Sequence, residues 1–557
     1  MAEHIIYYAC KYVPTELFEG FGAECRRLDP VPTDFDCADA CAHPNLCGFG
    51  KGILEAVHES PVRALVLTDC CDVMRRVYDV MKKEGTVDFL YLLSFPHKTG
   101  EREIRLFERS LRHLAEAWRE YSGDEFDGQK AAEAWERGRK EAAESQVSGR
   151  HVSVSGAHAG KLLMEEVSRR FDLPVTDDTC SGNRSLNPPT GPVTDEDSFF
   201  RYYSEALLRQ ENPCMRMLER RKEPVPEDAV GMILHTVKFC DYYSFFYHDV
   251  KGEGIPLLKI ETDGTRQSQG QIATRLDAFA ETLNVKRNEG RKMNGKIELA
   301  AGVDSGSTST DAVVMNADGK ILGSAIVATG AGAARGAEEA LSKALDQADC
   351  REEDLDALVT TGYGRETTGL SDNSVTEITC HARGANFLYP AARTVIDIGG
   401  QDSKVIRIDE TGHVLNFVMN DKCAAGTGRF LDMMARTLHM DLDELSRKGL
   451  DWKNDITISS MCTVFAESEV VSLVADNALP QDIIHGLNKA VAGKTVSLTK
   501  RLGGEPEYIM TGGVAQNEGV VKALEEKLGA KVHVPEEAQL CGAIGAALIA
   551  LGVGEQE

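Results

Sequence analysis

Short apolar runs alternate with helical patterns through residues 1–285. The segments RALVLTDCCD, HVSVSGAHAG, VGMILHTVKFCD and IPLLKIETD each predict a short buried strand that runs into a loop. Apolar residues between them recur every three or four positions, which predicts one face of a helix: Ile104, Phe107, Leu111, Leu114 and Trp118. Strands that alternate with helices indicate parallel sheets covered on both faces. We therefore predict two α/β lobes, about 1–125 and 150–285, joined by a solvated helix over 129–146.

The pattern changes in the second half of the chain. IELAAGVDSGSTSTDAVVMNADGKILG predicts two strands around a Gly/Ser/Thr turn, and Asp318-Gly319 predicts a second hairpin. RTVIDIGGQDSKVIRIDETGHVLNF repeats this design further along, which indicates an internal duplication. The basic stretch KRNEGRKMNGK, residues 286–296, cannot pack into a core and predicts an exposed linker. The fold class is thus α/β, with a two-lobed domain over 1–285 and a duplicated domain over 297–557.

Composition narrows the range of partners. The chain has 62 basic and 88 acidic residues and a formal charge of −26, which argues against nucleic acid or an anionic membrane as the main partner. No apolar run approaches the roughly 20 residues of a membrane span. The first residues, MAEHIIYYACKY, lack the basic n-region of an export signal. We expect a cytoplasmic protein.

Three glycine turns in the second half, over 304–310, 397–404 and 510–517, predict a nucleotide site. Small residues let backbone N–H groups come close to phosphate oxygens. Asp304 and Asp397 could hold a hydrated Mg²⁺ between the first two turns, and the third turn could lie against adenine or ribose. Asp304, Asp397 and Gln401 are the candidate catalytic residues. The candidate nucleotide-binding residues are Gly302, Ser305, Gly306, Ser307, Thr308, Thr310, Gly399, Gly400, Asp402, Lys404, Gly512, Gly513 and Asn517.

This constellation of turns resembles the acetate and sugar kinase, heat-shock and actin superfamily. The resemblance implies that ATP binds between two ribonuclease-H-like lobes and is hydrolysed to ADP. A sugar-kinase-like phosphotransferase with incidental cysteines is one alternative, and it predicts phosphate transfer by a colourless protein.

The fifteen cysteines are the second chemical feature. An odd count without an export signal argues against a disulfide framework, and leaves structural thiols, metal or cluster ligands, or redox catalysis. Cys423 and Cys462 each stand in a loop expected to open a helix, where the positive dipole end favours a thiolate. Two ligands cannot complete a four-cysteine iron–sulfur site, but two symmetric chains can share one. Two buried thiols are the alternative. An apolar helix face is expected to begin after each loop, with Phe430, Leu431 and Met434 after the first and with Val470, Val471 and Val474 after the second.

The segments CAAGTGRF, SSMCTVFAESEV, DIGGQDSK and TGGVAQN together resemble the activator ATPase of 2-hydroxyacyl-CoA dehydratases and its relative in ATP-dependent benzoyl-CoA reductase, over about 297–552. The resemblance implies a homodimer that bridges one 4Fe–4S cluster through Cys423 and Cys462. It also implies that ATP hydrolysis drives electron transfer at very low potential, with ferredoxin or flavodoxin as the electron donor. Cys350, Cys380 and Cys541 have no place in this pattern and are expected to be structural.

Several cysteines of the first half follow predicted strands. Cys70-Cys71 and Cys240 stand directly after strands, and Cys180 lies in a polar loop. Cofactors of parallel sheets lie at the carboxyl ends of strands, so we predict that these cysteines converge on a cluster; filling of the core is the alternative. Zinc is the weaker metal hypothesis, because only Cys37/Cys41 has the spacing of a zinc knuckle.

The segments YVPTELFEGFGAE, PNLCGFGKGILE, DCCDVMRRVYDV, VKFCDYY and GIPLLKIETD resemble the cluster-carrying subunits of 2-hydroxyacyl-CoA dehydratases and benzoyl-CoA reductases, over roughly 1–285. The resemblance implies a 4Fe–4S cluster with one open iron on Cys47, Cys71 and Cys240. This domain is shorter than is usual in that family. Its surplus cysteines could supply a second subcluster, as in related double-cubane proteins; they are Cys37, Cys41, Cys70, Cys180 and Cys214.

By these resemblances an electron donor and its acceptor share one chain, which raises their effective concentration. We expect an ATP-driven reductase or dehydratase, in which an electron passes from the C-terminal cluster to the N-terminal one. In the alternative, the first half is only a docking or relay module for a separate dehydratase or reductase.

Overall fold

The structure is a computed structural model that describes residues 4–214, 216–217, 225–250, 254–266, 269–284, 297–330, 332–371, 373–421, 423–459 and 462–552. The chain forms two compact units, and the division falls between Leu276 and Asp277, inside helix α10 (Gln269–Thr282). The predicted linker, 286–296, lies outside the described residues. No helix among the described residues is long and apolar enough to cross a membrane.

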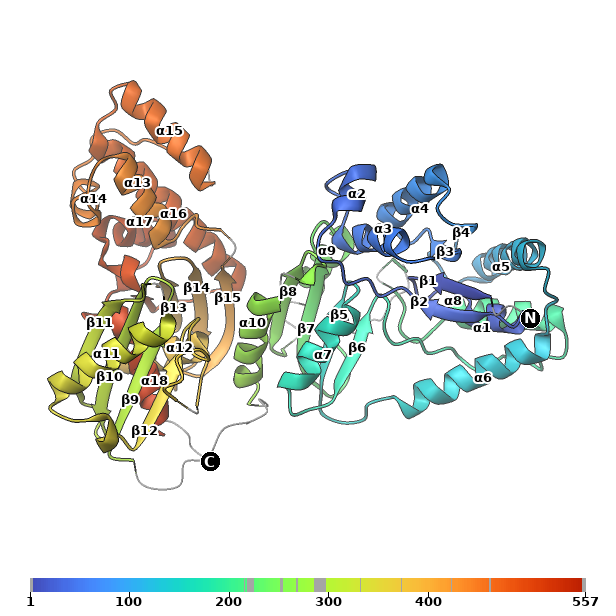
Figure 1. The fold of residues 1–557 in the computed structure, drawn as a ribbon, viewed down its shortest axis with the longest axis horizontal. Coiled ribbons are helices and arrows are strands. Elements are labelled where there is room, and N and C mark those ends of the chain that lie inside the picture. The colour runs from blue at the N-terminus through green and yellow to red at the C-terminus, as the bar shows by residue number, and fades with distance from the viewer. Residues whose placement is uncertain are drawn as a thin grey trace. The chain divides into compact units, whose positions relative to one another are not determined.

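The first unit is built on two 4-stranded parallel sheets, as the alternation of strands and helices predicts (Figure 1). The first sheet has the order β2-β1-β3-β4, with β1 (Ile5–Tyr8), β2 (Glu24–Arg27), β3 (Ala64–Thr68) and β4 (Phe89–Leu93). The second has the order β6-β5-β7-β8, with β5 (His151–Gly156), β6 (Val175–Thr179), β7 (Ala229–Val237) and β8 (Leu257–Thr262). Each of the four apolar segments singled out in the sequence contains one of these strands.

The helices of the first unit lie between its successive strands, except the last one, which follows β8. They are α1 (Thr15–Gly20), α2 (Asp36–Cys41), α3 (Gly48–Glu59), α4 (Asp72–Glu84), α5 (Glu101–Ser122), α6 (Gly128–Glu144), α7 (Gly160–Arg170), α8 (Glu196–Leu208), α9 (Asp241–Val250) and α10. The predicted apolar face is confirmed in α5, where Phe107, Leu111, Leu114 and Trp118 are buried.

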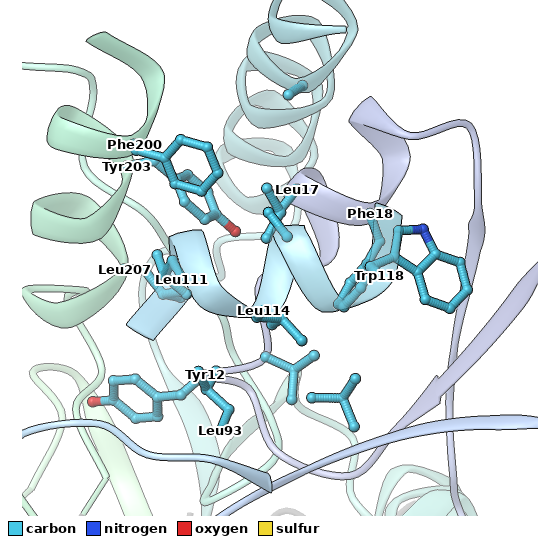
Figure 2. Close-up of a cluster of buried hydrophobic side chains, with 14 of the residues drawn as sticks. Tyr12, Leu17, Phe18, Leu93, Leu111, Leu114, Trp118, Phe200, Tyr203 and Leu207 are labelled. Atoms are coloured by element: carbon cyan, nitrogen blue, oxygen red, sulfur yellow. The ribbon is translucent and has the colours of Figure 1, made fainter. Parts of the chain in front are cut away.

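The packing departs from the sequence prediction in two places. Figure 2 shows Phe200 and Tyr203 of α8 in one core with Tyr12 and Trp118, although α8 lies between β6 and β7 in the sequence. The predicted lobe over 150–285 therefore gives part of its chain to the core of the first sheet. Helix α6 was expected to be solvated, but it buries Ala131, Ala134 and Trp135, because these positions form one apolar stripe.

The second unit repeats one design. The first sheet has the order β11-β10-β9-β12, with β9 (Leu299–Ser305), β10 (Ser309–Asn316), β11 (Ile321–Ala328) and β12 (Ala357–Thr361). The second has the order β15-β14-β13-β16-β17, with β13 (Thr394–Ile398), β14 (Ser403–Ile408), β15 (Val414–Asn420), β16 (Tyr508–Thr511) and β17 (Val532–His533). In both sheets an antiparallel meander is extended by parallel strands, so the predicted duplication is confirmed.

The helices of the second unit include an inserted group, α13–α15, between β15 and α16. They are α11 (Ala333–Ala348), α12 (Glu377–Leu388), α13 (Gly428–Thr437), α14 (Leu442–Lys448), α15 (Thr463–Ala475), α16 (Pro480–Leu502), α17 (Glu518–Leu528) and α18 (Cys541–Ala550). The inserted group carries the segments of Cys423 and Cys462.

Candidate functional site

The three glycine turns of the second unit meet. Gly400 lies so close to the first turn that a Cβ on it would stand 2.1 Å from Thr308 Oγ1. Gly512 has a φ of +83°, and a Cβ there would stand 2.5 Å from the Ile398 carbonyl oxygen. Because L side chains would clash at both positions, glycine is required to bring the turns together. The strand ends of β9, β13 and β16 thus form one site.

Asp304 and Asp397 lie on either side of a buried histidine. His381 Nε2 is 3.7 Å from Asp304 Oδ2, and His381 Nδ1 is 3.6 Å from Asp397 Oδ1. Thr511 Oγ1 also donates a hydrogen bond to Asp397 at 3.0 Å. Sequence reasoning missed His381, because the segment EITCHARGAN on α12 carries no recognised motif and only the fold brings it between the two turns.

Lys404 neutralises a cluster of buried carboxylates. Its Nζ lies 2.7 Å from Asp402, 3.2 Å from Asp397 and 3.3 Å from Glu377, and all four residues are buried. Burial alone would lower the pKa of Lys404, but the three carboxylates raise it well above its usual value. The structure therefore gives this candidate nucleotide ligand a second role, as the counter-charge of the site.

The carboxyl groups of the site differ in their electrostatics. Burial raises the pKa of Glu377 to about 8, and burial together with Asp304 raises that of Asp311 to about 8. Burial also raises the pKa of Asp304. Asp397 is the exception, because His381 and Lys404 outweigh its burial and lower its pKa. Asp397 is therefore the carboxylate best suited to stay ionised.

Several buried polar atoms of this site lack a hydrogen-bond partner within the described structure. They are Ser305 Oγ, Asp311 Oδ1, Thr361 Oγ1, Glu377 Oε1 and Ser403 Oγ. Unpaired buried polar groups are costly and indicate an absent partner. Hydrated Mg²⁺ with a nucleotide phosphate would satisfy such oxygens, so the donor set around Asp304 and Asp397 fits this ion.

Three candidate nucleotide residues have structural partners of their own. Gly302 lies within β9, where a Cβ would stand 2.1 Å from the Ala543 carbonyl oxygen of α18. The hydroxyl of Thr310 is hydrogen-bonded to that of Thr329 at 2.9 Å. Asn517 caps α17 by accepting the amide of Val520 at 3.1 Å. Ser307, Thr308 and Gln401, in contrast, are exposed on the turns.

The second turn is hydrogen-bonded directly to the start of α13. The Gly428 amide donates to the Gly399 carbonyl at 2.9 Å, and the Arg429 amide donates to the Gly400 carbonyl at 2.8 Å. Asn420 Nδ2 in turn donates to the Cys423 carbonyl at 2.9 Å. The Cys423 loop is therefore held between the second turn and the end of β15.

Cys423 and Cys462 are both exposed. Cys462 is the N-cap of α15, as the helix-opening pattern predicts. Cys423 also lies in a loop that leads into a helix, α13, but it precedes the N-cap residue, Thr427, by four positions. Cys380 and Cys541 are buried, as expected of structural thiols, and Cys350 is half-buried.

Helix α15 presents apolar side chains to the surface. Val470 is buried, but Val471 is 54% and Val474 is 48% exposed, so two valines of the predicted apolar face lie at the surface. Val464 and Phe465, next to Cys462, are 63% and 67% exposed. The remaining predicted face, Phe430, Leu431 and Met434 on α13, is buried.

In the first unit, cysteines form two adjacent groups at the carboxyl ends of the strands. We name Cys47, Cys71 and Cys240 triad A. Burial is the main cause that raises the pKa of Cys47 to about 12, and the nearby thiols of Cys240 and Cys71 contribute to this rise. In triad B, Cys10, Cys180 and Cys214, the thiols likewise act on one another, and burial raises the pKa of Cys180 and Cys214. The thiols of Cys10 and Cys71, together with burial, raise the pKa of Cys70, which therefore lies next to one member of each triad.

Besides Cys70, two of the candidate ligands lie outside these triads, and one member of triad B was missed. Cys37 and Cys41 lie on α2, where Cys37 is exposed and Cys41 half-buried. Cys10 was not among the candidates. Its position directly after the strand Ile5–Tyr8 was the available signal, since Cys70 and Cys240 were identified by the same rule.

A single metal ion does not fit these thiols. Among the described residues, no three His, Cys, Asp or Glu side chains are grouped closely enough to hold one ion. In an iron–sulfur cluster each cysteine binds a different iron, so the thiols stand further apart than the ligands of one ion. The donor set of buried and half-buried thiols in two triads therefore fits clusters better than zinc.

A cleft adjoins triad A within the first unit. It has a volume of about 700 Å³, open mouth included, and its lining includes Gly48, Phe49, His158 and Val237. His158 Nε2 is 2.9 Å from Asp29 Oδ1, and its ring stacks on Phe49 at 4.2 Å. Cys47 and Cys240 pack beside the same wall, against Val237.

Comparisons with known proteins match each half of the chain to a family. Residues 301–550 match the BadF/BadG/BcrA/BcrD ATPase family. Residues 10–148 and 157–283 match the 2-hydroxyglutaryl-CoA dehydratase, D-component.

Individual relatives cover the second half. The 2-hydroxyisocaproyl-CoA dehydratase activator of Clostridioides difficile is 45% identical over 249 residues, which is 45% of this chain and 93% of that protein. One of the subunits of benzoyl-CoA reductase from Thauera aromatica is 36% identical over 218 residues, 38% of this chain and 77% of that protein. The crystal structure of Acidaminococcus fermentans (R)-2-hydroxyglutaryl-CoA dehydratase component A is 43% identical, with a TM-score of 0.45, and covers 46% of this chain and 100% of that chain.

Proposed function

The chain belongs to the BadF/BadG/BcrA/BcrD ATPase family and joins to it a region of the 2-hydroxyglutaryl-CoA dehydratase D-component family, and we propose that it uses ATP hydrolysis to drive low-potential, single-electron transfer between two iron–sulfur sites of its own. The hydrogen bonds from Gly428 and Arg429 to Gly399 and Gly400 carry this proposal, because they join the nucleotide turn to the Cys423 loop. A conformational change of that turn on loss of the γ-phosphate would be transmitted to the Cys423 loop through these two backbone hydrogen bonds.

The nucleotide site holds ATP and Mg²⁺ with its own acidic residues. Asp397 stays ionised and Asp304 lies opposite it across His381, so this pair would orient the hydrated ion. Lys404 compensates the buried carboxylates before nucleotide binds. Gln401, exposed at the second turn, would position the attacking water.

Cys423 and Cys462 would hold one 4Fe–4S cluster together with the same two residues of a second chain. Both thiols are exposed, and each chain supplies only two ligands. The apolar side chains of Val464, Phe465 and Val471 around Cys462 offer the surface that a symmetric homodimer would cover. When bound, such a cluster supplies a one-electron donor, which ferredoxin or flavodoxin would recharge.

In the first unit, triads A and B would hold the accepting site. Their six thiols match a double cubane, with three cysteines for each half, whereas triad A alone would hold a single cubane with one open iron. The cleft beside Cys47 and Cys240 favours reduction or dehydration of a bound substrate over a purely relaying or docking role for this unit. A separate dehydratase or reductase as the final acceptor is the second candidate, since the relatives named as activators imply such partners.

The test compares Cys423→Ser with wild type, both purified without oxygen and reduced by dithionite. ATP-dependent reduction of the N-terminal site is followed by stopped-flow absorbance. We expect the ATP-dependent phase to disappear in Cys423→Ser while ATP binding persists. Cys350→Ser, which changes a half-buried thiol that is not a proposed cluster ligand, is the control and should behave as wild type. An unchanged rate in Cys423→Ser would overturn the proposal.

A further inference from the structure

A buried lysine directly follows Cys10 of triad B in the chain. Lys11 follows β1 and Cys10, and it is only 3% exposed. Its main chain is fixed by a buried network, because Arg184 Nε donates to the Lys11 carbonyl at 2.9 Å and pairs with Glu16. Tyr203 completes this network by donating to Glu16 at 2.6 Å. The lysine is therefore held in place by the core of the unit.

The ammonium group of Lys11 lacks a carboxylate partner. Burial lowers its pKa, and the groups that act in the opposite direction are first the thiols of triad B and then Asp177. The Asp177 carboxylate accepts hydrogen bonds from Thr179 instead. No carboxylate in the described part of the chain comes within 4.0 Å of Lys11 Nζ.

The other two buried lysines are paired. Lys51 Nζ is 2.5 Å from Asp39, and Lys404 Nζ contacts three carboxylates. A buried, unpaired ammonium is strongly unfavourable, and neutral thiols do not compensate it. Thiolates bound to iron carry the opposite charge. The exception at Lys11 thus points to an anionic group between the thiols.

We propose that Lys11 is the fixed counter-charge of the iron–sulfur group held by triad B and that it raises the reduction potential of that group. The inference rests on the proposed function of the first unit. Reduction adds one negative charge beside the ammonium, so a positive charge at Lys11 favours the reduced form. Lys11 acts through the field it exerts and is a positioning residue, not a catalytic one.

The experiment uses Lys11→Met, which keeps the length of the side chain and removes the charge. Iron per chain and the midpoint potential of the N-terminal site, by redox titration followed by electron paramagnetic resonance, are measured in the full-length protein. We expect the potential of Lys11→Met to shift to more negative values. The matched control is Lys51→Met, whose lysine is already neutralised by Asp39, and its potential should move less.

Thermal unfolding of the iron-free protein gives an independent result. Lys11→Met should raise Tm in the iron-free state, because a buried charge is lost, and should not raise it when iron is bound. A lower Tm of the iron-free variant, or an unchanged potential with full iron, would overturn the inference and leave the proposed function intact. If wild type binds no iron in its first unit, the proposed function itself fails, and the iron content distinguishes the two cases.

Discussion

The backbone amide of Gly428 donates a hydrogen bond to the carbonyl oxygen of Gly399 at 2.9 Å. Gly399 belongs to the second nucleotide turn, and Gly428 is the first residue of α13, just after the Cys423 loop. The contact is close enough that a Cβ on Gly428 would stand 3.2 Å from the Gly399 oxygen. The second nucleotide turn and the Cys423 loop are thus joined by a main-chain contact.

Gly428→Val should uncouple the two proposed activities, ATP hydrolysis and electron transfer. The branched side chain would push α13 away from the Gly399–Gly400 turn, so the Cys423 loop would lose its link to the nucleotide. We expect ATP-dependent electron transfer to fall by roughly 100-fold, the scale of a misplacement of about 1 Å, while nucleotide binding is kept. Gly493→Ala on α16 is the control, because a Cβ there meets only Lys527 at 3.9 Å. Equal losses in both variants would contradict the link.

Asp311→Asn should change how stability depends on pH in nucleotide-free protein. The pKa of Asp311 is raised from 3.8 to about 8, mainly by burial, so the folded state holds a proton that the unfolded state releases. This contribution to stability is fully present below about pH 4 and is lost as pH rises to about 8, by at most about 1.4 kcal/mol per pH unit. Urea unfolding at several pH values should show a shallower decline in Asp311→Asn than in wild type. Parallel curves would contradict the burial of an acid at this position.

Lys404→Met should destabilise the second unit strongly. It would remove the lysine counter-charge that Asp397, Asp402 and Glu377 share, which costs about 3–5 kcal/mol. Urea unfolding followed by circular dichroism measures the change. Lys489→Met, which removes a more exposed pair with Asp455, should cost no more than about 1 kcal/mol. A similar small loss for Lys404→Met would show that the cluster is compensated in another way.

Phe465→Asp should weaken the proposed homodimer. The side chain is 67% exposed on α15, and a charge there would have to be desolvated if a second chain covers it. Light scattering coupled to gel filtration should show a shift from dimer to monomer, together with loss of the shared C-terminal cluster. Leu106→Asp, at a 43% exposed position of α5, is the control and should keep the mass of wild type. A dimeric Phe465→Asp protein would place the interface elsewhere.

The sequence predicted the local elements well, because strand and helix periodicity follow from residue type alone. The face of α5 and the duplicated hairpins were predicted in this way. Contacts between distant segments were not predictable. His381 reaches the nucleotide turns, and α8 joins the core of the first sheet, only through tertiary packing. Cys10 could have been found from its place after β1, whereas the isolation of Lys11 from carboxylates could not.

The most direct measurement is the iron and acid-labile sulfide per chain in protein purified without oxygen. A cluster shared by two chains contributes about two irons to each, and triads A and B together would hold about eight more. We expect about ten irons per chain, or about six if triad A alone is filled. A value near two would reduce the first unit to a docking module, and a value near zero after reconstitution would contradict electron transfer by this protein altogether.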